Sequence, residues 1–360
     1  MKKFEHWDHI IENSEKWWNH ELERPLIQLS LKGIEPGLEK PKLPFCKYIS
    51  SFGLDAKNED IMELAEYEMA TKKYLGDAYP IVGFAHASDS LSVYLGAEVK
   101  AQTTTAWVHA EKQVEEIEDL SFEFDATNAF YKQITGVLES AVEHFKGRAV
   151  VRNPELGSGM DTIVPFREQT SLLMDLYDCP DEIHRVNREM QRAYFESFED
   201  CNKIISKNAL GYTTWTTVFS TKPFEMVQCD FSYMISPDQF DEFIKPYIIE
   251  QCQKIPRTIF HIDGPGVLNH LDSILAIEEL DGIQWIPGAG EEWCQHWPEV
   301  YRKARDAGKL IQLFGGMDTL DGVAESLGSA KDIVFMTACK ENERAKAEEF
   351  LNKYNVPVMG

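Results

Sequence analysis

His261 and Asp263 are the residues whose types and spacing first suggest chemistry. They lie in RTIFHIDGPG (residues 257–266), where a β-like run ends at a Gly-Pro-Gly turn. Because residues two apart in a strand point to the same face, the imidazole and the carboxylate should project together where the strand becomes a loop. The pair could therefore act as catalytic groups or bind a divalent metal.

A purely structural role is the alternative for the same residues. Asp263 would then cap the helix after the turn, and His261 would make a buried hydrogen bond. Cys339, at the end of DIVFMTAC, is also open to two interpretations. It is either a metal ligand or a small hydrophobic residue of the core.

Strand-like and helical segments alternate along most of the chain, and these elements must position the pair. About eight strand candidates separated by amphipathic helices predict an α/β protein with a closed (β/α)8 TIM barrel, in which residues 1–360 form one domain. Residues 1–75 are expected to form an N-terminal helical and loop extension packed on the barrel. The strand candidates outside that extension are YPIVGFA, TTTAWVHA, RAVVRN, ALGYTTW, RTIFHID, DGIQWIP, KLIQLFGG and DIVFMTA.

The carboxyl ends of barrel strands are where active sites lie, so polar residues at those ends are candidates for the site. His, Asp and Cys from different strands would suit a tetrahedral zinc site with one open position, and we expect His261, Asp263 and Cys339 to bind that metal. The other residues at strand ends are His86, Asp89, Trp215, Gln284 and Asp318.

Charge and composition exclude several classes of protein. The chain has 36 Lys and Arg against 60 Asp and Glu, a net charge of −24, which argues against nucleic acid as a partner. No apolar run approaches the length of a membrane span or signal peptide, so we expect no membrane association. Seven scattered cysteines do not form a disulfide pattern, which favours a cytoplasmic location.

Five segments in order resemble the uroporphyrinogen decarboxylase superfamily, a group of TIM-barrel enzymes. They are HASDSLSVYLGAEV (86–99), VQCDFSYMISPDQFDEFIKPY (227–247), FHIDGPGVLNHLDSI (260–274), LFGGMD (313–318) and DIVFMTAC (332–339). The superfamily contains a porphyrinogen decarboxylase and zinc-dependent methyltransferases that serve corrinoid proteins and coenzyme M. The resemblance places a catalytic aspartate at Asp89. The superfamily also keeps an aspartate at the position of Asp230, which would contact substrate or cap the next helix.

The methyltransferase branch matches this sequence better than the decarboxylase branch. The decarboxylase grips its carboxylates with arginines after Arg-Pro, but here no arginine lies between Arg24 and Arg148. The methyltransferases carry a His-x-Cys-Gly zinc motif, which His261 and Gly264 match, and a late cysteine, which Cys339 matches. Asp263 replaces the central thiolate, so the acceptor need not be a thiol.

The resemblance implies a metal-dependent methyltransferase that moves a methyl group between a small methylated substrate or corrinoid protein and a thiol or similar acceptor. Its metal would be zinc or another divalent ion, a partner protein could carry a corrinoid, and a homodimer is one possible assembly. His86, Trp215, Asp230, Gln284, Trp285 and Asp318 would contact the substrate, although Trp285 could equally pack a helix against the barrel. The alternatives are a lyase acting on a porphyrinogen through Asp89, and a non-catalytic corrinoid- or tetrapyrrole-binding protein.

Overall fold

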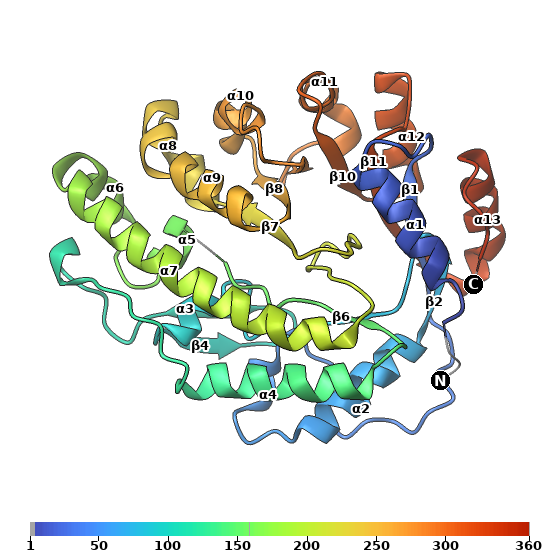
Figure 1. Ribbon diagram of the computed structural model, residues 1–360, viewed down its shortest axis with the longest axis horizontal. Helices are drawn as coiled ribbons and strands as arrows, with labels where there is room; N and C mark the ends of the chain where they lie inside the picture. The colour runs from blue at the N-terminus through green and yellow to red at the C-terminus, as the bar shows by residue number, and fades with distance from the viewer. Residues whose placement is uncertain (1–3, 158, 360) are drawn as a thin grey trace.

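The computed structural model describes residues 4–157 and 159–359, and these form an α/β fold around a parallel sheet. Figure 1 shows α8 to α12 in an arc above the strands, with α2, α4 and α7 below them. The strands are β1 (Leu26–Lys32), β2 (Lys72–Gly76), β3 (Ile81–Val82), β4 (Glu98–Ala101), β5 (Ala106–His109), β6 (Val150–Val151), β7 (Phe224–Gln228), β8 (Arg257–Asp263), β9 (Gly282–Ile286), β10 (Leu310–Phe314) and β11 (Ile333–Lys340).

Helices precede or follow most of these strands. The α-helices are α1 (Trp7–Trp18), α2 (Asn58–Ala70), α3 (Ser90–Tyr94), α4 (Ala129–His144), α5 (Gly159–Ile163), α6 (Gln169–Asp178), α7 (Pro180–Ile205), α8 (Pro237–Phe243), α9 (Lys245–Lys254), α10 (Leu271–Leu275), α11 (Pro298–Asp306), α12 (Met317–Leu327) and α13 (Arg344–Lys353). Two 3₁₀ turns matter for the site, η4 (Asp230–Met234) and η5 (Val267–His270). Among the described residues, none of the helices combines the length and apolar character needed to cross a membrane.

Seven strands form the main sheet in the order β2-β1-β11-β10-β9-β8-β7. All neighbours pair in parallel except β1 and β2, which are antiparallel. Strands β3 and β6 form a separate parallel pair. Within the described residues, these pairings do not complete the closed ring of eight strands that the sequence predicts.

Several strand predictions need correction. The predicted strand TTTAWVHA is β5, which pairs only with β4 in a small antiparallel sheet. ALGYTTW (209–215) forms no strand, and only an isolated bridge joins Tyr212 to Ser220. In β3 and β6 two residues each are in ladder positions. These segments lack the neighbouring strand in the main sheet with which a full strand would form a continuous ladder of backbone hydrogen bonds.

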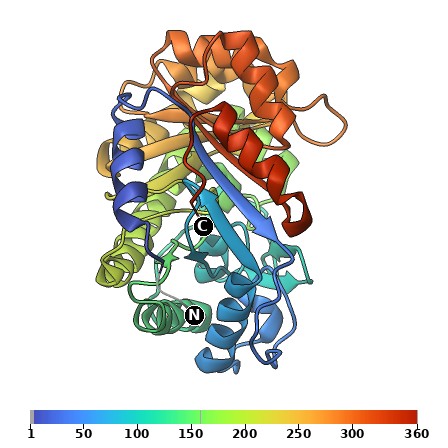
Figure 2. The same ribbon diagram turned by 90° about the vertical axis from the view of Figure 1, so that its right-hand side faces the viewer.

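Residues 1–75 do more than extend the fold, because they supply a central strand. Strand β1 lies between β2 and the last strand, β11, so strands from the N-terminal and C-terminal parts of the chain lie side by side (Figure 2). Helix α1 buries Trp17 and Trp18 against residues from the amino ends of the strands. Leu26 of β1 and Phe224 of β7 belong to this one cluster although four strands lie between them in the sheet, which shows that the sheet is strongly curled.

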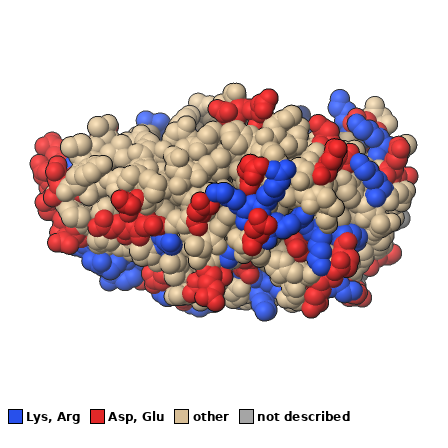
Figure 3. Space-filling model, turned by 90° about the horizontal axis from the view of Figure 1, so that it is seen from above, with Lys and Arg blue, Asp and Glu red and all other residues tan. Residues whose placement is uncertain are grey.

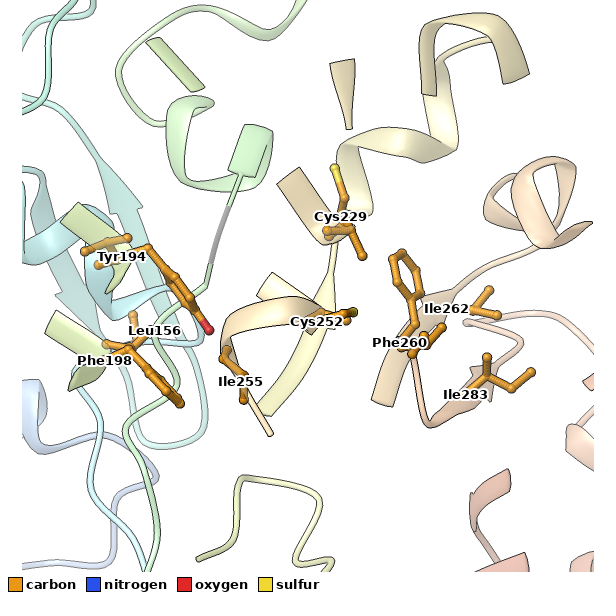
Figure 4. Close-up of a cluster of buried hydrophobic side chains, with 14 of the residues drawn as sticks. Leu156, Tyr194, Phe198, Cys229, Cys252, Ile255, Phe260, Ile262 and Ile283 are labelled. Carbon is orange, nitrogen blue, oxygen red and sulfur yellow. The ribbon is translucent and has the colours of Figure 1, made fainter. Parts of the chain in front are cut away.

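The opposite face of the sheet packs against the helices in the main core. Figure 4 shows Phe260 and Ile262 of β8 beside Ile283 of β9, all in this cluster. Because side chains alternate along a strand, His261 and Gln284 must point to the inner face instead. At the helical surface, acidic and basic side chains lie beside one another, as Figure 3 shows for the face at the top of Figure 1.

Candidate functional site

Asp230, His261 and Asp263 come together at the carboxyl ends of β7 and β8. One ligand-capable atom from each residue lies within 4.8 Å of the others. His261 and Asp263 project from the same face of β8, as the two-residue period predicts, with His261 Nε2 3.7 Å from Asp263 Oδ2. The three side chains thus offer one imidazole nitrogen and two carboxylate groups to a single point.

The turn after β8 holds Asp263 near the segment that carries Asp230. Gly264 has a φ of +84°, a left-handed conformation that favours glycine. A Cβ atom at Gly266 would lie 2.6 Å from the ring of Tyr233 in η4, so the turn and η4 pack closely. His270 Nε2 also donates a hydrogen bond to the Ser232 carbonyl oxygen at 2.8 Å. These contacts position Asp230 beside β8.

His261 is oriented by a chain of amide hydrogen bonds across the inner face of the sheet. Its Nδ1 donates to Oε1 of Gln284, and Nε2 of Gln284 donates to Oε1 of Gln312. Nε2 of Gln312 donates in turn to Sδ of Met336 at 2.9 Å. Because the amide oxygen can only accept, this network leaves the lone pair of His261 on Nε2, the atom that faces Asp263.

Asp161 is a buried carboxylate that the sequence analysis did not identify. Its oxygens accept hydrogen bonds from the backbone nitrogens of Asp230 and Phe231, both at 2.7 Å. Burial, followed by the charge of Asp230, raises the pKa of Asp161 to about 8. Asp161 lies at the start of a short helix, α5, and no strand in the sequence points to it. Its role is visible only from its contacts.

The charges of His261 and Asp263 affect the ionisation of Asp230. Loss of hydration raises the pKa of Asp230, the charge of His261 lowers it, and the charge of Asp263 raises it. Asp230 is exposed to solvent when the whole residue is considered. Its pKa is raised because its carboxylate group lies close to the protein and to Asp263. A bound cation would relieve the repulsion between these acidic groups.

The proposed capping role of Asp263 finds no support in the described residues. The turn after β8 is η5, whose N-cap is Gly266, and no side chain caps it. His261 does make a buried hydrogen bond, as the structural alternative predicted, but that bond uses Nδ1 and leaves Nε2 available. Both interpretations of His261 are therefore compatible with its surroundings.

Of the other residues that the sequence predicted for the site, some lie beside Asp230, His261 and Asp263 and others do not. The Trp215 ring makes an edge contact with His261 at a centroid distance of 5.1 Å, so it lies beside the group. Gln284 is part of the hydrogen-bond chain described above. Asp318 is exposed in the first turn of α12 and is not a member of the group.

Cys339 and Trp285 lie on the other face of the sheet. Cys339 is the register partner of Leu31 and packs against the main core. Burial and then the charge of Glu343 raise the pKa of the Cys339 thiol. Trp285 is the register partner of Ile262 and is fully buried against Trp297. The structure does not bring these two side chains to the group formed by Asp230, His261 and Asp263.

His86 and Asp89 lie within the part of the fold built by α3, α4 and α5. His86 Nε2 donates to Gln133 Oε1 at 2.8 Å, and burial lowers the pKa of this imidazole to about 4. Asp89 is the N-cap of α3 and accepts hydrogen bonds from Ser92 and from Thr162 at 3.2 Å. Burial raises the pKa of Asp89 to about 6, although these hydrogen bonds lower it in part.

The fold and this group of side chains define an α/β protein with a candidate metal site at the carboxyl ends of parallel strands. No protein-family model and no curated protein matches the sequence. Among solved structures, the fold is similar to that of a methyltransferase from Methanosarcina mazei, with a TM-score of 0.62 and 13% identity over 96% of this chain and 99% of that chain. At this identity the similarity shows a shared fold and nothing about activity.

Proposed function

We propose that this protein is a metal-dependent methyltransferase on a (β/α)8 barrel, in which Asp230, His261 and Asp263 bind one divalent cation. The observation that carries this proposal is the convergence of their ligand atoms within 4.8 Å. The similarity in fold to a methyltransferase supports the reaction class. Cys339 is left out of the proposed ligand set because its strand position faces the helices.

The residues fit a divalent cation by their chemistry. Imidazole nitrogen and carboxylate oxygen both bind zinc, and without a thiolate the site also suits harder ions such as Mn²⁺. Three protein ligands leave a position for a substrate, as in catalytic zinc sites. The hydrogen bond from Nδ1 of His261 to Gln284 is the kind of outer-sphere contact that metal-binding histidines use.

Each residue would have a distinct part in methyl transfer. Gln284 holds the imidazole so that Nε2 faces the ligand position, and Asp161 holds the backbone of Asp230. Trp215 covers one edge of His261 and shields it from water. When bound, the cation would lower the pKa of a thiol or similar acceptor and so provide the nucleophile.

The methyl donor would be a small methylated substrate or a corrinoid carried by a partner protein. The alternative of a lyase acting through Asp89 is weaker, because Ser92 and Thr162 already occupy the oxygens of that carboxylate. A non-catalytic corrinoid-binding protein would not need the group formed by Asp230, His261 and Asp263. We therefore place methyl transfer first.

Demethylation of methylcobalamin tests this proposal. The protein, loaded separately with Zn²⁺, Mn²⁺ or Co²⁺, is mixed with methylcobalamin and a panel of small thiols, and loss of the methyl–cobalt bond is followed by absorbance. We expect turnover by the wild type and loss of at least about a hundredfold in His261→Ala. Asp318→Asn is the matched control, because Asp318 is exposed and outside the group.

The outcomes separate the parts of the proposal. Metal binding without methyl transfer to any acceptor would contradict the reaction and keep the metal site. Equal metal content in the wild type and His261→Ala would contradict the metal site itself. Formation of coproporphyrinogen from uroporphyrinogen would instead support the lyase.

A further inference from the structure

A large cavity lies on the same inner face of the sheet as His261, beside β1, β2 and α2, and Met336 at the end of the amide chain from His261 lines it. It has a volume of about 690 Å³ and lies between α2, one face of β1 and β2, and the ends of β3, β10 and β11. Gln28, Ser30 and Lys32 of β1 line it, as do Lys72 and Tyr74 of β2. These positions alternate along each strand and are paired in the ladder, Lys32 with Lys72 and Ser30 with Tyr74. None of the three proposed metal ligands lines this cavity.

A row of lysines crosses the sheet at one end of the cavity. Lys32 is the register partner of Lys72 on β2 and of Lys340 on β11. Like charges directly opposite one another in a sheet are destabilising. Within residues 4–157 and 159–359, no carboxylate oxygen lies within 4.0 Å of any of these three ammonium groups. The protein thus keeps three neighbouring ammonium groups without a direct ion pair despite a net charge of −24.

The arrangement of charges around Lys72 changes the pKa of its ammonium group. Burial lowers its pKa, the nearby carboxylate of Glu68 raises it, and the charge of Lys32 lowers it again. Glu68 also lines the cavity, and burial raises the pKa of that carboxyl group. An anion between Lys32 and Lys72 would offset the repulsion and complete the solvation of both ammonium groups.

Tyr74 and Arg152 add two more polar groups to the cavity. The hydroxyl of Tyr74 is buried and has no hydrogen-bond partner among the described residues, so a donor is left unused. Arg152 lies across Gly83, where a Cβ atom would be 1.7 Å from its Nε, so that only glycine leaves room for this side chain. Arg152 also forms an ion pair with Glu155 at 2.9 Å. A buried, unused hydroxyl is costly unless something accepts its proton.

Apolar side chains form the rest of the wall. Ile61 and Leu64 of α2 line the cavity together with Phe84 and Phe314. We propose that this cavity binds an organic anion, with its charged head between Lys32, Lys72 and the Tyr74 hydroxyl and its apolar body against α2. Carboxylate, sulfonate and phosphate heads share the chemistry that these donors recognise. The residues proposed to bind the anion differ from the three proposed metal ligands, so loss of the metal would not remove anion binding, and loss of the anion site would leave the metal ligands in place.

Binding of 4-phenylbutyrate, measured by isothermal titration calorimetry, tests the proposal. The neutral amide, 4-phenylbutyramide, has the same apolar body and lacks the charge. We expect the carboxylate to bind with a Kd of about 1 mM or tighter and the amide at least about tenfold more weakly. Phenylpropyl sulfonate and phosphate analogues then distinguish the head groups.

Two variants test the residues that carry the argument. Lys72→Met keeps most of the side-chain volume and should weaken carboxylate binding by about tenfold or more. Tyr74→Phe removes only the hydroxyl and should weaken it by about two- to tenfold. Lys72→Met should change binding of the neutral amide far less than binding of the carboxylate. Lys73→Met is the matched control, because Lys73 is the next residue of β2, on the other face, and pairs with Glu341 at 2.9 Å.

Thermal unfolding adds a readout that separates binding from structure. If Lys72 serves a ligand, Lys72→Met relieves the repulsion and should raise the melting temperature without ligand while it weakens binding. A lowered melting temperature with unchanged affinity would assign Lys72 to structure and overturn the proposal. So would equal affinity for the acid and the amide, or no binding of either up to about 10 mM.

Discussion

His261 donates through Nδ1 to Gln284 and presents Nε2 to Asp263, 3.7 Å away. The two contacts use opposite sides of one imidazole, and together they determine its orientation. A histidine that binds metal usually has this arrangement, with the second nitrogen donating to an oxygen.

Replacing Gln284 should weaken metal binding without removing a ligand. In Gln284→Met the imidazole loses its acceptor, so we expect a loss of about 10- to 100-fold in affinity for Zn²⁺. Competition with a chromogenic chelator measures this. Gln312→Met should have a smaller effect, because it leaves the contact between His261 and Gln284 in place. An equal loss of affinity in both variants would mean that Gln284 and Gln312 act through packing and not through the hydrogen bond to His261.

Asp230 and Cys339 are the two alternatives for the third metal ligand, beside His261 and Asp263. We expect Asp230→Asn to lose most of the bound metal in elemental analysis, and Cys339→Ser to keep it, since Cys339 faces the main core. The Co²⁺-substituted protein gives an independent check, because a thiolate ligand produces a strong near-ultraviolet charge-transfer band. Such a band in the wild type, absent from Cys339→Ser, would restore the ligand set that the sequence suggested.

Glu225 should make the protein less stable as the pH rises. Burial raises the pKa of Glu225 to about 8 from its ordinary value of 4.5, so the native state favours the protonated form. Between these two pH values the unfolded chain ionises and the native state does not, so stability falls as the pH rises and levels off above about 8. One oxygen, Oε2, is buried without a partner among the described residues.

Glu225→Gln tests this pH dependence. The variant should lose much of the fall in stability, so its advantage over the wild type should grow from pH 5 to about pH 8. Urea unfolding at several pH values measures the difference. Glu292→Gln is the control, because Glu292 is exposed. A constant difference between Glu225→Gln and the wild type across this range would contradict the buried-acid explanation.

Asp77 should be important for the stability of the N-terminal half. Its oxygens accept hydrogen bonds from Arg24 at 2.7 and 2.9 Å and from the backbone of Ile27 at 2.8 Å, and the residue is 1% exposed. Burial raises the pKa of Asp77, but the hydrogen bonds from Arg24 and then His9 outweigh it and lower the pKa overall. The stabilisation is therefore present above the ordinary value of 3.8 and is lost as the pH falls.

Asp77→Asn should lower the free energy of unfolding by about 3–5 kcal/mol, because it leaves the Arg24 charge without its partner. Chemical denaturation near neutral pH measures the loss. Asp55→Asn, an exposed aspartate in a loop, should change stability by less than about 0.5 kcal/mol. Similar values for the two variants would show that the buried ion pair contributes little.

Local patterns in the sequence determined several features of this protein. The two-residue period placed His261 and Asp263 on one face of β8, and the sheet confirms it. Ser236 and Pro237 begin a helix with a complete capping box, as their types predict. The helical segment that begins there is divided into α8 and α9, because Pro246 lies in the first turn of α9. Each of these features depends on neighbours within a few residues.

Tertiary structure alone decided which side chains meet. Asp230 joins the group because η4 packs against the turn after β8, and Asp161 supports this position because its carboxylate accepts hydrogen bonds from the backbone of η4. Cys339 lies near the carboxyl end of β11, as His261 does in β8, but the register of β11 with β1 turns it toward the helices. A shift of one residue along a strand reverses the face, and that register is set by hydrogen bonds to strands distant in the sequence. No local pattern contains those partners.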